Sequence, residues 1–102
     1  MKREFEVTVT RTDCYIVTIE EDKLDKDLIN EYEESIHKLE GDKIEELAKN
    51  IGFMSMDNSN NFYEGIGYLK VDDISYPSKE IVQGIEVETA VLEDYDTDIM
   101  EL

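Results

Sequence analysis

Carboxylates are the side chains of this sequence that gather in groups, and the chemistry they offer is the binding of positive charge. On a helix, Asp27, Glu31 and Glu34 fall on one flank at positions i, i+4 and i+7. A second group lies in the C-terminal part, where the segment from position 80 to 102 has eight acidic residues and no Lys or Arg. Six of these eight acidic residues make up the second group, namely Glu86, Glu88, Glu93, Asp94, Asp96 and Asp98. We expect both groups to be partner-binding residues that pair with Lys and Arg of another molecule.

Nucleophiles, general bases and metal ligands of other kinds are scarce. The chain has one histidine, His37, and one cysteine, Cys14, which together cannot complete a zinc site within one chain. His37 lies off the apolar stripe of its expected helix, so we expect it to be solvated. Cys14 begins an expected strand, and we expect a buried or half-buried thiol without activation. The sequence therefore indicates no catalytic residue, and we expect a protein that is not an enzyme.

The sequence also lacks the motifs of a calcium-binding loop and of a dinucleotide-binding turn. An EF-hand loop starting at Asp57 would need glycine at its sixth position and glutamate at its twelfth, where Phe62 and Tyr68 stand. Gly65 and Gly67 lack the third glycine and the following helix of a dinucleotide-binding turn. We therefore expect neither a metal site nor a cofactor.

The charge of the chain restricts its partners. Its 102 residues include 27 Asp and Glu against 10 Lys and Arg, a formal net charge of −17. Such a protein is repelled by nucleic acid and anionic membranes and attracted to surfaces rich in Lys and Arg, of which nucleic-acid-binding clefts are the commonest. Solubility or adaptation to high salt is the alternative explanation. Basic patches interleaved with aromatics are absent, so we expect no direct binding of nucleic acid.

Length and segment composition predict one domain in the cytoplasm. No apolar run approaches the ~20 residues that cross a bilayer, and the basic pair near the N-terminus is not followed by an apolar stretch. A lone cysteine suits a reducing compartment. We expect a single domain over residues 1–102 in which the acidic tail over 94–102 is partly flexible.

The first half of the chain predicts two strands and two helices. Alternation over residues 4–10 and β-branched residues over 14–19 predict two strands, joined across a short polar break into a hairpin. Apolar residues that recur at spacings of three and four predict a helix over 23–40, with Asp22 as its N-cap. A second helix is expected to begin after Asp42 and to end at Gly52 as its C-cap glycine.

The second half predicts two more strands. A polar loop over 57–61 precedes a strand over 62–71, a connection over 72–78 contains Pro77, and a last strand covers roughly 82–93. The order ββααββ predicts an α+β fold with an antiparallel sheet of about four strands and two helices packed on one face. The other face is then left to water or to a partner, and its expected acidic residues are Glu4, Glu6, Glu86 and Glu88.

Parts of the sequence resemble small proteins carried by bacteriophages and prophages. The resemblance covers about half of the chain and rests on Phe5 to Asp13, on Tyr15-Ile16-Val17 with the Ile19-Glu20-Glu21-Asp22 run that follows, on Glu64-Gly65-Ile66-Gly67-Tyr68, and on the acidic C-terminal end. In size and charge the chain is also similar to phage anti-defence proteins, among them anti-CRISPR proteins and anti-restriction DNA mimics. That similarity implies a protein that occupies the DNA-binding cleft of a host nuclease in the bacterial cytoplasm. No shared motif carries a functional residue over to a position of this chain.

Three functions of a binding protein follow. The leading hypothesis is an inhibitor whose carboxylates pair with the Lys and Arg that normally hold phosphates of nucleic acid. An immunity protein or antitoxin that covers a basic toxin is the second. The third is a small phage structural or assembly protein that uses its strand edges, which would have to associate against its own charge repulsion.

Overall fold

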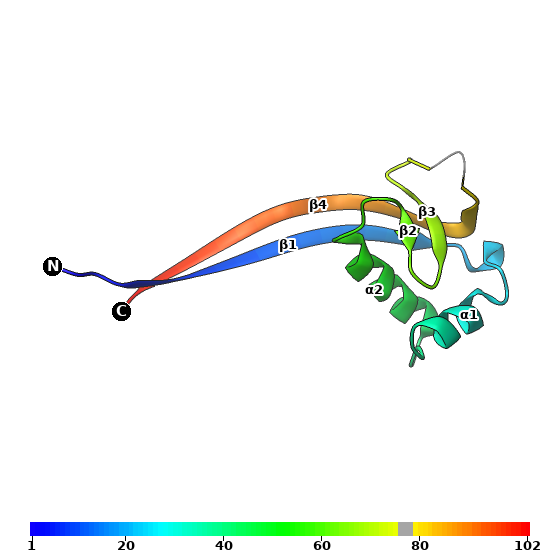
Figure 1. The fold of residues 1–102 in the computed structure, drawn as a ribbon, viewed down its shortest axis with the longest axis horizontal. Coiled ribbons are helices and arrows are strands. Elements are labelled where there is room, and N and C mark those ends of the chain that lie inside the picture. The colour runs from blue at the N-terminus through cyan, green and yellow to red at the C-terminus, as the bar shows by residue number, and fades with distance from the viewer. Residues whose placement is uncertain (76–78) are drawn as a thin grey trace.

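The computed structural model describes residues 1–75 and 79–102, and the chain forms a small α+β body from which two long strands project (Figure 1). The sheet has four strands in the order β1-β4-β3-β2. The elements are β1 (Phe5–Ile19), the 3₁₀ turn η1 (Glu21–Lys23), α1 (Leu28–Ser35), α2 (Lys43–Ser55), β2 (Phe62–Tyr63), β3 (Gly67–Val71) and β4 (Ile81–Glu101).

The α+β class, the four strands and the two helices are as predicted, but the order of the elements along the chain and the sheet type are not. The observed order is β-α-α-β-β-β, and the sheet is mixed because β3 runs parallel to β4. The N-terminal hairpin is wrong as well, because β1 continues through residues 11–13 without turning back. Its partner is instead the end of the chain, since β1 pairs antiparallel with β4 from Phe5↔Glu101 to Ile19↔Ile85.

The predicted helix over 23–40 is broken at both ends by side chains that bind backbone. Asp25 Oδ1 accepts the N–H of Asp27 at 2.9 Å, which competes with helix formation, and α1 begins only at Leu28 rather than after Asp22. At the other end the Glu33 carboxylate accepts the N–H of Leu39 at 3.0 Å, so residues 36–39 leave the helix.

The predicted start of the second helix is confirmed, but its predicted end at Gly52 is wrong. Asp42 Oδ1 accepts the N–H groups of Ile44 and Glu45 and so caps α2. Gly52 lies inside the helix, which runs on to Ser55.

The predicted strand over 62–71 is divided by a turn. Gly65 has φ +80 within that turn, and its missing side chain leaves room for Ile36, because a Cβ there would lie 2.5 Å from the Ile36 side chain. The expected connection over 72–78 falls partly outside the described residues.

One core joins both helices to one face of the sheet. The stripe residues Leu28, Tyr32 and Leu39 are buried as predicted, together with Leu47 and Ile51 of α2. From the strands this core takes Tyr63, Leu69, Ile85 and Val87, and Tyr15, Val17 and Ile19 of β1 pack against it. Neither helix, in the part of the chain that the structure describes, has the length and apolar content needed to span a membrane.

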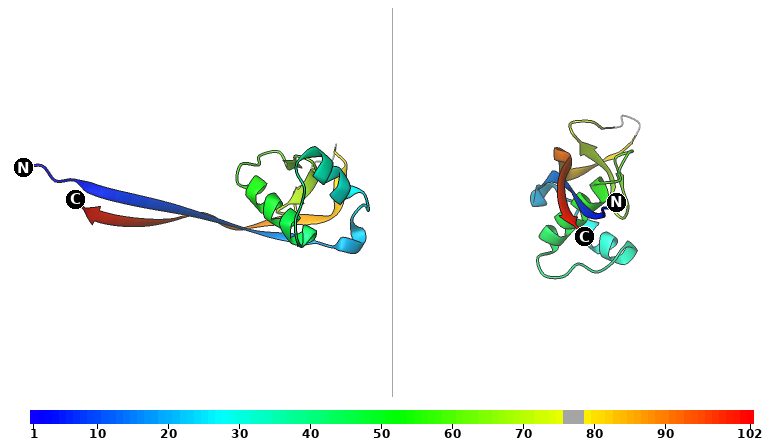
Figure 2. Two further views of the ribbon diagram at one scale, coloured as in Figure 1. Left: turned by 90° about the horizontal axis from the view of Figure 1, so that it is seen from below. Right: turned by 90° about the vertical axis from the view of Figure 1, so that its left-hand side faces the viewer.

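Residues 5–12 of β1 and 94–101 of β4 form a two-stranded extension, which we call the ribbon (Figures 1 and 2). The rest of the chain is called the body. The ribbon stretches the molecule to 66 × 32 × 20 Å, and the radius of gyration is 18.2 Å, against ~13 Å for a compact chain of this length. The acidic tail, for which we expected some flexibility, lies in β4 and accounts for one of the two ribbon strands.

Candidate functional site: the acidic face of the ribbon

The register of β1 and β4 sorts the ribbon side chains by type onto its two faces. Residues directly opposite one another in a ladder share a face. One face, which we call the acidic face, pairs Thr8 with Asp98, Thr10 with Asp96 and Thr12 with Asp94, and continues to Glu6 opposite Met100. The other, called the apolar face, carries Phe5, Val7, Val9, Tyr95 and Ile99.

Three predicted site residues therefore form a column. Asp94, Asp96 and Asp98 alternate along β4, which places neighbouring carboxylates about 6.8 Å apart at the usual strand rise. The threonines opposite them are short and leave the carboxylates open to a partner. Within the described residues none of these three aspartates, nor Glu6, makes an ion pair with a Lys or Arg of the chain. Their negative charge is therefore available to a cation from outside.

The same face continues into the body. Glu86 and Glu88 lie opposite Thr18 and Ile16, whose side chains alternate with the core-facing residues of β1. Both glutamates are exposed on the sheet face that the helices leave open, as expected from the sequence. Lys70 Nζ lies 3.9 Å from Glu86, so this end of the column is partly compensated.

Glu93 departs from the column because β4 contains an extra residue at this point. The ladder passes from Thr12↔Asp94 to Cys14↔Val91, and Glu93 takes a left-handed backbone conformation with φ 52. Its carboxylate lies 3.7 Å from Arg11, on the face opposite to the three aspartates. This predicted site residue therefore belongs to the junction between ribbon and body.

A side-chain cluster fixes that junction. Asp13 Oδ1 accepts the backbone N–H of Glu93 at 3.0 Å, and Asp13 Oδ2 lies 2.9 Å from Arg11 Nε. The hydrogen bond from Glu93 and the ion pair with Arg11 hold the pKa of Asp13 below its ordinary value. Arg11 and Asp13, which the sequence assigned to a short polar break, therefore secure the bulge from which the ribbon projects.

The second predicted group stands apart from the acidic face. Asp27 occupies the N-cap position of α1, and Glu31 and Glu34 lie within this helix. Since α1 packs on the covered face of the sheet through Leu28 and Tyr32, its carboxylates cannot join the column on the open face. The structure thus brings together five of the nine predicted residues, namely Glu86, Glu88, Asp94, Asp96 and Asp98.

Glu6 and the threonines opposite the aspartates were not predicted as site residues, although the alternation of residue types in the sequence indicates a strand here. Glu6 was expected on the open sheet face but was not assigned to the site, and the threonines opposite the aspartates were not considered. Asp94, Asp96 and Asp98 alternate with Tyr95, Thr97 and Ile99, which is the period of a strand. High acid content favoured the interpretation of this segment as a tail.

The histidine and the cysteine of the chain lie in separate parts of the fold, His37 after α1 and Cys14 in β1. His37 is exposed as predicted; its ring packs edge-on against Tyr32, and its Nε2 lies 3.4 Å from Asn50 Nδ2. Cys14 is exposed, which corrects the predicted burial, because it points to the open face of β1. Residues 1–75 and 79–102 contain no cluster of three His, Cys, Asp or Glu side chains placed to hold a metal ion.

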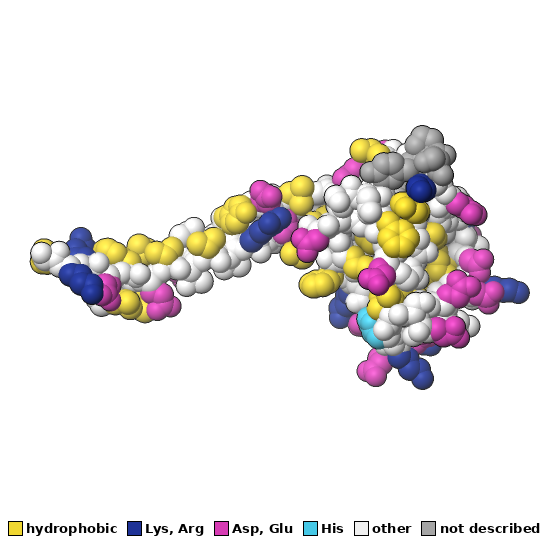
Figure 3. Space-filling model, in the orientation of Figure 1, with side chains coloured by type: hydrophobic (Ala, Val, Ile, Leu, Met, Phe, Trp, Pro, Cys, Tyr) yellow, Lys and Arg dark blue, Asp and Glu magenta, His cyan; other side chains and the backbone are white. Residues whose placement is uncertain are grey.

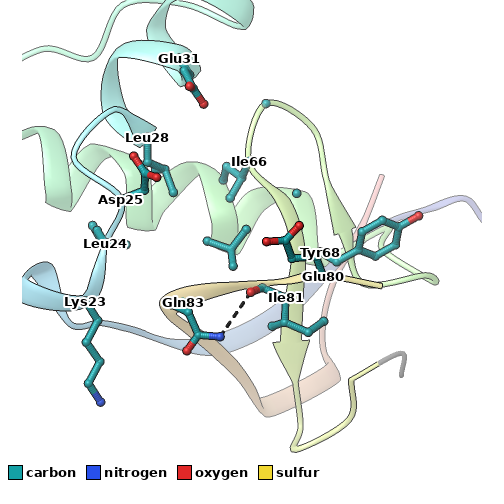
Figure 4. Close-up of a pocket in the computed structure, with 13 residues that line it drawn as sticks. Lys23, Leu24, Asp25, Leu28, Glu31, Ile66, Tyr68, Glu80, Ile81 and Gln83 are labelled. Carbon is teal, nitrogen blue, oxygen red and sulfur yellow. Dashed lines mark hydrogen bonds between the residues drawn. The ribbon is translucent and has the colours of Figure 1, made fainter. Parts of the chain in front are cut away.

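A hollow of about 650 Å³ lies between the segment after η1 and the start of β4 (Figure 4). Its charged lining groups are Lys23, Asp25, Glu31 and Glu80, and Gln83 Nε2 donates to the backbone oxygen of Ile81 at 3.4 Å. Lys23 is also paired with Glu20 at 2.9 Å. Its described lining residues include no Ser, Thr, Cys or His.

Comparison with known proteins leaves the family of this chain open. No protein-family model, curated protein or solved structure matches it. The resemblance to phage proteins therefore stays a prediction, and function has to be argued from the geometry of the ribbon.

Proposed function

We propose that this protein is an inhibitor that lays the acidic face of its ribbon into the basic, nucleic-acid-binding cleft of another protein, such as a host defence nuclease. The observation that carries the proposal is the column of Asp94, Asp96 and Asp98, projected away from the body on a ribbon two strands wide. Two paired strands measure roughly 10 Å across, which suits entry into a cleft.

The spacing of the column supports mimicry of a nucleic-acid strand. An antiparallel strand rises about 3.4 Å per residue, and B-DNA rises about 3.4 Å per nucleotide. Alternate residues of β4 therefore offer one carboxylate for every second phosphate along the axis. Lys and Arg side chains that hold the phosphates of one DNA strand can pair with carboxylates of such a column.

Charge supports the same partner. At a net charge of −17 the protein is steered toward basic surfaces, and this attraction weakens as salt screens it. The acidic face directs the final contact because, within the described part of the chain, Asp94, Asp96 and Asp98 have no Lys or Arg partner. An immunity protein for a basic toxin would use the same contact, and the identity of the captured partner distinguishes the two functions.

Capture from bacterial lysate tests the proposal. The immobilised protein is exposed to lysate at low salt, bound proteins are challenged with duplex DNA, and the released protein is identified and assayed as a nuclease with and without inhibitor. We expect one nucleic-acid-binding protein that DNA displaces and that the inhibitor inactivates.

A charge-matched pair of variants makes the test specific. Asp94→Asn/Asp96→Asn/Asp98→Asn removes three charges from the acidic face, and Asp27→Asn/Glu31→Gln/Glu34→Gln removes three from α1. We expect the first variant to lose inhibition at least tenfold and the second to keep it. Equal loss in both would mean that overall charge, and not the acidic face, determines binding.

A further inference from the structure

The apolar face of the ribbon is exposed without a covering element. Phe5, Val7, Val9, Tyr95 and Ile99 each expose between 44% and 64% of their surface. Together they leave on the order of 500 Å² of apolar surface in water, at the upper end of what single soluble chains tolerate. A two-stranded ribbon is also marginally stable in water unless something packs against it.

The charges on this face largely compensate one another, because Arg3 and Arg11 lie against the carboxylates of Glu101, Asp13 and Glu93. At the tip Arg3 donates to both carboxylate oxygens of Glu101 at 2.9 Å, and its guanidinium lies 5.0 Å from the centre of the Phe5 ring. At the base Arg11 pairs with Asp13. Figure 3 shows the hydrophobic side chains along the ribbon with basic side chains at its tip and base. A basic partner is therefore attracted to the acidic face, while the apolar face can approach another acidic molecule without strong repulsion.

The order of residues along the apolar face is complementary to itself. Its four successive rungs pair Phe5 with Glu101, Val7 with Ile99, Val9 with Thr97, and Arg11 with Tyr95. If a second copy packs on it in the opposite direction about a two-fold axis, β1 lies over β1 of the other copy. Val7 of each copy then meets Val9 of the other, Phe5 meets Arg11, and Tyr95 meets Glu101. This is the self-matching pattern that a two-fold interface requires.

Size and electrostatics are compatible with such a pair. Two copies would bury about 1,000 Å² in total, which is near the lower limit of specific interfaces, so the association should be reversible. Packed sheets lie about 10 Å apart, and the two acidic faces would point outward at a greater separation. That distance exceeds the ~8 Å screening length at physiological salt, so the two acidic faces repel each other only weakly there.

We propose that the apolar face of the ribbon binds the same face of a second copy of this chain, in antiparallel orientation. The proposal is independent of the inhibitor function. It leaves both acidic faces exposed on opposite sides of the pair, so the pair has two surfaces for basic partners.

A matched pair of single cysteines tests the contact with little disturbance of the fold. In a Cys14→Ser background, Thr97→Cys places a thiol on the apolar face and Thr10→Cys places one on the acidic face; both threonines are exposed. A bifunctional thiol reagent with a reach of about 10 Å should join Thr97→Cys molecules into dimers at least tenfold faster than Thr10→Cys molecules. Equal rates would mean random collision and would overturn the proposal.

Sedimentation equilibrium gives an independent measurement. The mass of the unmodified protein should rise with concentration from that of one chain toward that of two, and more readily at 0.5 M than at 0.05 M salt. Val7→Thr/Ile99→Thr keeps β-branched side chains and should weaken pairing at least tenfold. Ile16→Thr, on the opposite face, should leave it unchanged. A single-chain mass at every concentration and salt, or equal weakening by Ile16→Thr, would refute the pairing.

Discussion

The body and the ribbon share the strands β1 and β4, but helices cover one face of these strands only in the body. In the body, Ile85 and Val87 alternate with exposed residues and are 1% and 3% exposed, because the helices pack on them. In the ribbon, Val7 and Ile99 alternate in the same way, but no element of the described residues packs over them, and they are 53% and 64% exposed. Alternation of apolar and polar residues along a strand therefore specifies which side chains share a face. Whether that face is buried depends on another element, such as a helix, that packs on it.

The difference has an energetic consequence. Side chains of the body that pack in the core stabilise the folded chain, whereas apolar side chains of the ribbon gain little until another molecule covers them. Function and stability are thereby separated along one pair of strands, and the predictions below test that separation.

The largest expected effect is in the core. Leu47→Ala should lower the free energy of unfolding by about 2–5 kcal/mol, because Leu47 is fully buried between α2 and the sheet. Val7→Ala in the ribbon should cost less than about 1 kcal/mol in dilute protein, measured by the same urea denaturation. Equal losses would show that the ribbon and the body are stabilised alike.

A smaller effect is expected from the buried hydrogen bond of the body. Tyr63 Oη and Ser55 Oγ lie 2.8 Å apart, and Ser55 Oγ also donates to the Ile51 backbone oxygen. Tyr63→Phe should therefore cost about 1 kcal/mol in thermal or urea unfolding. Tyr68→Phe is the control, since the Tyr68 hydroxyl makes no hydrogen bond within the described residues, and a cost equal to that of Tyr63→Phe would contradict the assignment.

The smallest effect is local and lies at the junction. The pKa of Asp13 is lowered by the Glu93 N–H and then by Arg11, so the ionised carboxylate favours the folded junction. This stabilisation is present above the ordinary pKa of 3.8 and is lost as pH falls through the lower folded value. In wild-type protein, protection of the Glu93 amide from hydrogen exchange should fall in that acidic window.

The variant Asp13→Asn should reduce this protection already at neutral pH and remove most of its acid dependence. Glu101→Gln, which disrupts the ion pair at the tip, serves as the control and should leave the Glu93 amide unaffected. Unchanged protection in Asp13→Asn would show that another contact holds the bulge.

Short-range patterns predicted the elements whose determinants are local. The apolar stripe identified Leu28, Tyr32 and Leu39 as buried, and Asp42 identified the start of α2, because both depend on neighbours within a few residues. The end of α1 was predicted too late in the chain, because the Glu33 carboxylate accepts the N–H of Leu39. The spacing of apolar residues contains no information about such a side-chain contact.

Long-range pairing could not be derived in the same way. The polar residues 11–13 look like a turn, but Asp13 receives the N–H of a residue 80 positions away. The parallel pairing of β3 with β4 likewise depends on contacts between distant segments. The acidic column was half predictable, since alternation places Asp94, Asp96 and Asp98 on one face, whereas the bulge that removes Glu93 from it depends on the junction.

The most direct test of the account measures which ribbon face the captured basic partner covers. In the Cys14→Ser background, the alkylation rates of Thr10→Cys and Thr97→Cys are compared in dilute protein with and without that partner, at 0.05 M and 0.5 M salt. The account predicts that the partner slows alkylation at Thr10→Cys at low salt, that high salt restores it, and that Thr97→Cys is unaffected. Protection of Thr97→Cys instead, or of both sites equally, would contradict the assignment of the acidic face as the docking surface.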